Sequence, residues 1–279
     1  MKHISMALAF LIVVAGPFTP AFAQSSSQVK RQQPSVSTSN EELYHVLIVK
    51  AAPGKLRDMI DAYLNAPADP NASAPPLLLR HVEGDDWDLL VLTPLGKEDK
   101  LTLAAPSAAE QQFIQRVRPL AARHTDTFAA GPRWTDTLAA LSGGVTDSAV
   151  VPTSGSSAPR ETTSGRSAAP DKSVYIVTTY RALPGHRDQL EQTVRKLAAL
   201  NPGRMVTLAH MEGAPWDLLT VERYDSWATL ADDEANPNMQ TLRTQGFSSP
   251  DGPSFELREH MAEHHDTIAV RVKGGGGNK

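Results

Sequence analysis

Two short segments of the chain repeat the same His, Trp and Asp residues at the same spacing, and these side chains are the ones best suited to chemistry. The first segment, Leu79–Leu92, reads LRHVEGDDWDLLVL, and the second, Leu208–Val221, reads LAHMEGAPWDLLTV. Eight of their fourteen paired positions are identical. We interpret the repeat as an internal duplication, and we take the repeated His and Asp residues as candidate acid–base groups.

Each segment has the pattern of a β-hairpin, in which directly opposed residues have Cβ atoms about 4.5–5.5 Å apart. If the strands pair closely around the turn, His81 lies opposite Asp88, and His210 lies opposite Asp217. A carboxylate beside an imidazole holds one tautomer and makes the ring a better general base. We therefore predict these four residues as the candidate catalytic group. The alternative is that both pairs are structural contacts that keep the hairpins in register.

Six more residues recur in matched positions and are candidate ligand-binding residues: Tyr44 and Tyr175, Trp87 and Trp216, His124 and His264. The aromatic residues have a simpler explanation as core side chains, because aromatics dominate buried area. The histidines lie where a helix is expected to end and a strand to begin, and the helix dipole favours a cation there. Lys50 and Arg181 also recur, at the end of the first strand of each half, and we expect them to be solvated.

The segment from His260 to His264, HMAEH, matches the H-x-x-E-H pattern of one class of zinc peptidases, which places both histidines on one face of a helix. The corresponding positions of the first half are Leu120 and Arg123, and few residues follow that could supply an acidic ligand. Adventitious binding of a divalent cation by these two histidines and His265 is the alternative. The sequence contains no phosphate-binding Gly loop, dinucleotide fingerprint or nucleophile elbow. We predict no cofactor and no metal site.

Hydrophobic periodicity and turn residues give both halves the order strand–helix–strand–strand–helix–strand, which is the ferredoxin-like order. The elements expected in the first half are strand Tyr44–Lys50, helix Lys55–Leu64, strands Leu77–Glu83 and Trp87–Leu92, a helix opened by a capping box at Ser107, and a short strand Asp126–Ala129. Those expected in the second half are strand Val174–Arg181, helix His186–Leu200, a hairpin around Gly213, a helix from Ser226, and strand Thr267–Val272.

The composition divides the chain into six segments. Residues 1–23 have the basic start, apolar run and small-x-small end of a cleavable signal peptide, with cleavage expected after Ala23. The segments that follow are a flexible leader (24–41), the first repeat (42–141), a Ser/Gly/Pro-rich linker (142–172), the second repeat (173–272) and a flexible tail (273–279). The second repeat carries an insertion near 236–253, which we expect to be either a surface loop or a lid over a pocket.

Composition also excludes several classes of function. The chain of 279 residues has 41% hydrophobic residues, which is enough to form hydrophobic cores. Its formal charge of -4 gives no excess of basic residues for binding nucleic acid. It has no cysteine, which excludes disulfides, thiolate nucleophiles and Cys-ligated metals. From the signal peptide we expect a periplasmic or secreted protein that does not bind the membrane after cleavage, and from the charge we expect no nucleic-acid partner.

Several features resemble the dimeric α+β barrel superfamily: the order of elements, the Pro-Gly after the first strand of each half, the Trp-Asp-Leu-Leu strand and the helix start Asp225-Ser-Trp227. Within it, the NIPSNAP and antibiotic-biosynthesis-monooxygenase-like groups are the most similar. The resemblance spans both halves, residues 42–130 and 173–272, but no catalytic motif of a subfamily maps onto them. It implies an α+β fold in which two tandem ferredoxin-like repeats close on each other as an intrachain barrel, a monomeric pseudo-dimer that could also self-associate.

That superfamily includes cofactor-free oxygenases, isomerases, haem enzymes and ligand binders, so the fold leaves function open. Our first hypothesis is an exported small-molecule-binding protein or cofactor-independent enzyme, monooxygenase- or isomerase-like, with the His and Asp groups in an apolar pocket. The alternative is a non-catalytic structural or stress-associated interaction protein with the same fold. A cavity lined by the His and Asp side chains favours the first hypothesis, and one filled by Leu and Trp favours the second.

Overall fold

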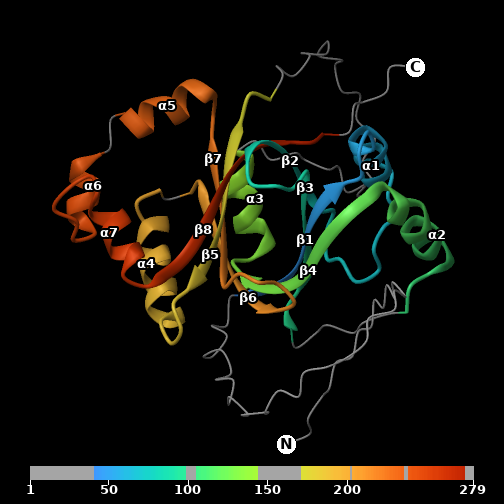
Figure 1. Ribbon diagram of the computed structural model, residues 1–279, viewed down its shortest axis with the longest axis horizontal. Coiled ribbons are helices and arrows are strands. Elements are labelled where there is room, and N and C mark those ends of the chain that lie inside the picture. Colours follow the sequence, from blue (N-terminus) through green and yellow to red (C-terminus); the bar gives the residue numbers. More distant parts are fainter. Residues whose placement is uncertain (1–40, 99–104, 144–170, 202, 236–237, 274–279) are drawn as a thin grey trace, which may run out of the picture. The chain divides into compact units, whose positions relative to one another are not determined.

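The computed structural model describes residues 41–98, 105–143, 171–201, 203–235 and 238–273. The expected signal peptide, almost all of the leader, most of the linker and most of the tail lie outside the described residues. Figure 1 shows the strands of the described chain arranged around a central helix, α3 (Trp134–Ser142). Among the residues described, no helix is long and apolar enough to cross a membrane.

The first half follows the predicted order of elements. Its elements are β1 (Glu42–Ala51), α1 (Leu56–Leu64), β2 (Leu77–Gly84), β3 (Leu89–Gly96), α2 (Ala108–Val117), the 3-10 turn η2 (Arg118–Leu120), β4 (Ala121–Gly131) and α3. The predicted capping box is present at the start of α2: the Ser107 hydroxyl accepts from the Glu110 N–H, and the Glu110 carboxylate accepts from the Ser107 N–H. The α-helix α2 ends at Val117, and Pro119 follows in η2, because proline lacks the N–H that would continue the helix.

The second half has the same order with extra helices before its last strand. Its elements are β5 (Val174–Ala182), α4 (Arg187–Ala198), β6 (Met205–Glu212), β7 (Leu218–Tyr224), α5 (Trp227–Ala235), α6 (Met239–Thr244), α7 (Gly252–Arg258) and β8 (Met261–Arg271). The insertion near 236–253 thus contributes α6 and the start of α7. Its Leu242 and Phe247 side chains are buried, so it is more than a surface loop.

The eight described strands form one closed antiparallel barrel in the order β1-β3-β2-β8-β5-β7-β6-β4. Within each half the strands lie in the same spatial order, β4-β1-β3-β2 in the first and β8-β5-β7-β6 in the second. The two halves join along two seams, β2 with β8 and β4 with β6. Closure pairs the outer strands of both sheets, which is how a barrel protects strand edges. The predicted combination of α+β class and closed barrel is confirmed.

A glycine stands at each seam, in close contact with the main chain of the other half. Gly84 and Gly213 have φ angles of 120° and 110°, in the region that favours glycine. A Cβ atom on Gly84 would lie 2.3 Å from the main-chain oxygen of Asp266, and one on Gly213 would lie 2.4 Å from that of Asp126. Both repeated Glu-Gly dipeptides therefore serve barrel closure, because any larger residue would push the strands apart.

The interior of the barrel is filled by α3 together with inward-facing strand side chains. The main core cluster joins Trp134, Ala140 and Leu141 of α3 to residues of the strands and hairpins, which include Tyr44, Val46, Leu79, Leu90, Tyr175, Val177, Leu208 and Leu219. The sequence analysis did not predict α3. Because α3 and these side chains fill most of the barrel interior, a ligand site must lie at one end of the barrel.

The outer faces of the barrel carry smaller cores beneath the covering helices. Under α1, Met59 packs on Val49 and Leu89. Under α4, the matching cluster contains Tyr180, Leu190, Val194 and Leu218. Because side chains alternate along a strand, β1 and β5 present one face to these helices and the other to the barrel interior.

Two expectations for the histidine-rich segments are wrong. The HMAEH segment is not helical, because β8 begins at Met261, so His260 and His264 do not share a helical face. The strands β4 and β8 both begin earlier than the sequence predicted. They therefore place His124 and His264 inside strands, where the dipole of a preceding helix does not explain them.

Candidate functional site

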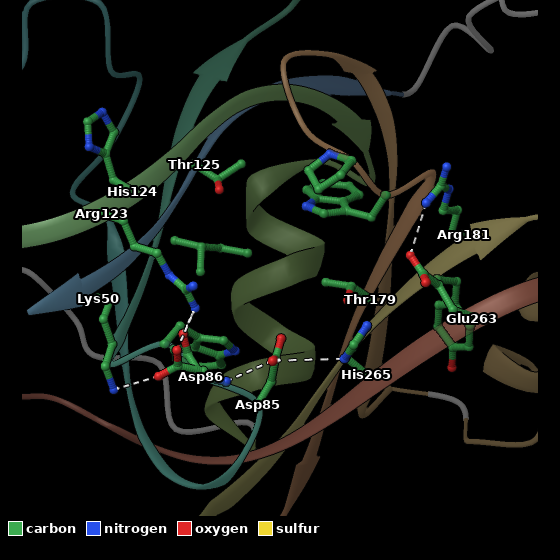
Figure 2. A pocket seen from close by; sticks show the side chains of 15 residues that line it. Lys50, Asp85, Asp86, Arg123, His124, Thr125, Thr179, Arg181, Glu263 and His265 are labelled. Carbon is green, nitrogen blue, oxygen red and sulfur yellow. Dashed lines mark hydrogen bonds and ion pairs between the residues drawn. The ribbon is translucent and has the colours of Figure 1, made fainter. Parts of the chain in front are cut away.

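A cavity of about 300 Å³ lies at one end of the barrel (Figure 2). Its walls come from the ends of β1 and β5, the beginnings of β4 and β8, and the turns of the β2–β3 and β6–β7 hairpins. Both halves thus contribute the same three parts of their fold. No residue of the α6–α7 region is among the described residues that line it, so the lid expected near 236–253 finds no support here.

Charged side chains line the cavity and are paired differently in its two halves. Lys50 on β1 and Arg123 on β4 are directly opposite, and both bind Asp86 of the β2–β3 turn, with Nζ–Oδ1 and Nη2–Oδ2 distances of 2.9 Å each. In the second half, Arg181 on β5 lies opposite Glu263 on β8, and the two pair at 3.3 Å. Figure 2 shows the two arrangements on opposite sides of the cavity.

The Lys50–Asp86 contact also shifts the titration of both groups. The hydrogen bond to Asp86 raises the pKa of Lys50 above its usual value, and the same hydrogen bond lowers the pKa of Asp86 below its own. Both groups are therefore charged at neutral pH. Asp86 has 65% of its side chain exposed, so solvent screens this pair.

A His–Asp pair does lie in the cavity, but it is made between the halves. His265 Nδ1 on β8 is 3.8 Å from Asp85 Oδ1 in the β2–β3 turn, and both residues line the cavity (Figure 2). That distance is too long for a hydrogen bond, and the contact becomes an ion pair when the ring is protonated. Thr179 lies on β5 directly opposite His265, and Thr125 of β4 also lines the cavity.

The repeated tryptophans line the cavity as buried side chains. Trp87 and Trp216 are 5% and 6% exposed and reach the cavity from the two hairpins. Each packs against the repeated histidine of its own hairpin: the ring centroids of His81 and Trp87 are 5.6 Å apart, and those of His210 and Trp216 are 5.3 Å apart. The Trp216 Nε1 atom is buried without a hydrogen-bond partner among the described residues.

The register predicted for the two hairpins is present in the main chain. The His81 N–H donates to the Asp88 carbonyl at 3.0 Å, and the His210 N–H donates to the Asp217 carbonyl at 2.9 Å. The two rings differ in their surroundings. His210 Nε2 accepts from the Ala214 N–H at 3.0 Å, whereas His81 Nε2 is buried with no hydrogen-bond partner in the described part of the chain. Neither ring is among the side chains that line the cavity.

The Asp88 and Asp217 carboxylates bind main-chain groups of their own halves. Asp88 Oδ2 accepts from the Ala51 N–H at 2.7 Å, and Asp217 Oδ2 accepts from the Ala182 N–H at 2.8 Å. Each carboxylate therefore ties its hairpin to the end of the neighbouring first strand. Arg187 Nε lies a further 3.8 Å from Asp217 Oδ1.

The two repeated tyrosines lie in the core and hold α3 in the barrel. The Tyr44 hydroxyl donates to the Pro132 carbonyl and shares a 2.9 Å hydrogen bond with the Thr137 hydroxyl. The Tyr175 hydroxyl donates to the Leu141 carbonyl at 2.8 Å. Burial raises the pKa of both tyrosine hydroxyls, so they stay neutral.

The repeated histidines of β4 and β8 pair with aspartates two residues on. His124 Nε2 lies 3.1 Å from Asp126, whose other oxygen lies 2.9 Å from His45 Nε2. His264 Nε2 lies 3.3 Å from Asp266. His124 borders the cavity, but Figure 2 shows its ring pointing away from the other labelled side chains.

The sequence analysis missed most of the charged residues of the cavity. Lys50 and Arg181 were noticed as a repeat but expected in solvent. Strand alternation could have placed Lys50 on the face of Tyr44 and therefore inside the barrel. His265 and its neighbours were missed because β8 was expected to begin only at Thr267.

Comparison with known proteins adds no family. No family model matches the chain, and no curated protein matches it. Among solved structures, a candidate monooxygenase from Fusobacterium nucleatum is similar at 8% identity over 85% of this chain and 94% of that one, with a TM-score of 0.48. An anthrone oxidase-like protein is similar at 10% identity over 84% of this chain and 92% of that one, with a TM-score of 0.47. A candidate monooxygenase from Lactobacillus acidophilus is similar at 10% identity over 83% of this chain and 94% of that one, with a TM-score of 0.45. All three scores are below 0.5, so the fold assignment rests on the strand pairing.

Proposed function

We propose that this protein binds a small molecule in the cavity at the end of the barrel, and that the ligand has a flat apolar part and an anionic group. The observation that carries the proposal is a cavity of about 300 Å³ where two buried tryptophans meet three strand-borne cations. Its volume is at the lower end of the range for ligand sites. Indole rings receive flat apolar surface, and a cation beside them fixes the orientation of an acid group.

The preference for an anion follows from how the cavity charges are held. The cations are Lys50, Arg123 and Arg181, and they project from barrel strands. Their partners Asp86 and Glu263 are 65% and 50% exposed, and such exposed pairs contribute little stability. A ligand carboxylate that also buries its ring can therefore compete with them for the guanidinium groups.

If the protein is an enzyme, His265 is the side chain best placed to act as general base. It lines the cavity, and Asp85 lies where it can stabilise the imidazolium that forms when the ring accepts a proton. The resemblance to the antibiotic-biosynthesis-monooxygenase-like group extends this proposal to cofactor-independent oxygenation or isomerisation. In either reaction the first task of His265 is to remove a proton from the bound molecule. His81 and His210, first expected to be catalytic, then support the two tryptophans. Asp88 and Asp217 then hold the hairpins against the neighbouring strands.

We also propose that the two halves descend from one duplicated ferredoxin-like unit, so that the chain is a pseudo-dimer. The first support is that the strands have the same spatial order in both halves. The second is that Asp88 and Asp217 make equivalent main-chain contacts in their own halves, and that Tyr44 and Tyr175 both bind α3. The expectation that the protein is exported to the periplasm or secreted stays part of the proposal and rests on residues 1–23.

The test is a binding assay that separates the flat part of the ligand from its charge. Quenching of tryptophan fluorescence is measured for a panel of aromatic carboxylic acids and for the matching uncharged amides. We expect the acids to bind more tightly than the amides, Arg123→Gln to remove that difference, and Trp216→Leu to weaken both. Trp227→Leu is the matched control, because Trp227 is 48% exposed and lies on α5. Equal binding of acids and amides would exclude the anion preference.

A non-catalytic structural role is the second candidate, and one observation favours it. The helix α3 and the core side chains fill most of the barrel, so the open space is confined to one end. This candidate predicts that no acid or amide of the panel quenches fluorescence, and that Trp216→Leu changes only stability.

A further inference from the structure

A pair of histidines outside the cavity has the geometry of two ligands of one metal ion. His186 lies just before α4, and His260 lies just before β8, 74 residues further along the chain. Their Nδ1 atoms are 3.1 Å apart, and both rings are partly buried. Two nitrogens bound to one ion at about 2.0–2.1 Å lie about 2.9–3.4 Å apart at a right or tetrahedral angle. The observed separation falls within this range.

The main chain holds both histidines in these positions. The Leu183 N–H donates to the His260 carbonyl at 2.9 Å, and the His186 N–H donates to the Leu183 carbonyl at 2.9 Å. The His260 N–H donates to the Leu257 carbonyl at 3.0 Å. The turn after β5 and the turn after α7 are thus tied together through Leu183, so the rings meet without further rearrangement.

The surroundings favour a cation. His260 borders a shallow depression that also contains the carboxylate residues Glu256 and Glu259. Glu256 is already paired with Lys196 at 2.7 Å, while Glu259 is exposed at the end of α7. The depression is open to solvent, which leaves room for water molecules as further ligands. Among the described residues, no three His, Cys, Asp or Glu side chains converge as a complete metal-binding set.

We propose that His186 and His260 form a two-imidazole site for a transition-metal ion of the Zn²⁺, Ni²⁺ or Cu²⁺ class, with water completing the coordination. Imidazole nitrogen is a ligand that these ions prefer, whereas Mg²⁺ and Ca²⁺ require oxygen. Without metal, the two nitrogens share one proton in an N–H···N hydrogen bond, and the ion takes the place of that proton. Binding pins the turn after β5 to the start of β8. The site differs from the trio His260, His264 and His265 that the sequence suggested, because β8 directs the last two residues to opposite faces.

The experiment uses the tag-free chain from Gln24 onward, which omits the expected signal peptide, and Zn²⁺ as the probe. Isothermal titration at neutral pH should show one ion bound, and His186→Ala and His260→Ala should each weaken binding by more than about tenfold. His264→Ala is the matched control, because His264 lies on β8, which begins directly after His260, and it should leave the affinity unchanged. Circular dichroism confirms that each variant is folded.

A second measurement needs no variant, because substitutions here could disturb the turn. Electron paramagnetic resonance of the Cu²⁺-loaded wild-type protein should show coupling to two imidazole nitrogens. Mg²⁺ should not compete for the site. The proposal is overturned if Zn²⁺ does not bind, if binding survives both His186→Ala and His260→Ala, or if the copper spectrum shows fewer than two imidazoles.

Discussion

The two repeated histidines should respond oppositely to the same substitution. His81 Nε2 is buried without a partner in the described chain, and an unsatisfied buried polar atom costs about 1–3 kcal/mol. His81→Leu removes that atom and gives up part of a ring contact with Trp87, worth about 0.5–1.5 kcal/mol. The net effect expected is between neutral and about 1 kcal/mol of added stability. His210→Leu instead leaves the Ala214 N–H unpaired, and we expect a loss of about 1–3 kcal/mol.

The difference between the two variants is therefore about 1–4 kcal/mol, and it is the quantity to measure. Urea denaturation followed by circular dichroism gives the free energy of unfolding of both variants and of the wild type. Because His81 and His210 occupy matched positions with nearly equal contacts to tryptophan, each variant is a control for the other. An equal loss of stability in both would refute the reasoning, since it would mean that His81 Nε2 is as well paired as His210 Nε2.

Three more predictions concern barrel closure, the central helix and pH. Gly84→Ala should destabilise the protein by more than about 2 kcal/mol in urea denaturation, because the new Cβ meets the main chain of β8 at 2.3 Å. Tyr44→Phe should lower the free energy of unfolding by about 1–3 kcal/mol, because two buried partners in and before α3 lose a hydrogen bond. Burial acts to raise the pKa of Asp171, but hydrogen bonds from Ser173 and Lys273 outweigh it and lower the pKa to about 2. The stability that Asp171 contributes is therefore present above pH 4 and lost as the pH falls toward 2. Asp171→Asn should cost about 1 kcal/mol at pH 7, after allowing for solvent screening, and only a small fraction of that at pH 2, when unfolding is followed at both.

The parts of the fold that the sequence predicted well are those fixed by local signals. The register of the two hairpins follows from their turns and from alternating burial, so the main-chain pairing of His81 with Asp88 was foreseen. The side-chain partner of Asp88 was not, because the Ala51 N–H belongs to another strand. A carboxylate accepts from whichever donor the tertiary fold places beside it, and hairpin register alone does not identify that donor.

The central helix shows a second limit of the sequence analysis. Trp134, Leu138 and Leu141 have helical spacing, and Gly143 follows in the left-handed conformation that ends helices, with φ of 63°. These signals could have located the helix. They could not have shown that it fills the barrel, because that position depends on Tyr44 and on strands far away in the sequence.

The cavity is asymmetric because matched positions of the two halves carry different charges. In the first half Lys50 faces a second cation, Arg123, and Asp86 in the turn lies against both. In the second half the position of Arg123 is occupied by Glu263, which pairs with its own cation, and the position of Asp86 is occupied by Pro215. An acid is present in the turn only where the strand pair lacks one. A symmetric dimer would have to repeat one of these arrangements twice. A single chain can combine both, and it thereby places on one wall a carboxylate shared by two cations, and on the other wall a separate, exposed ion pair.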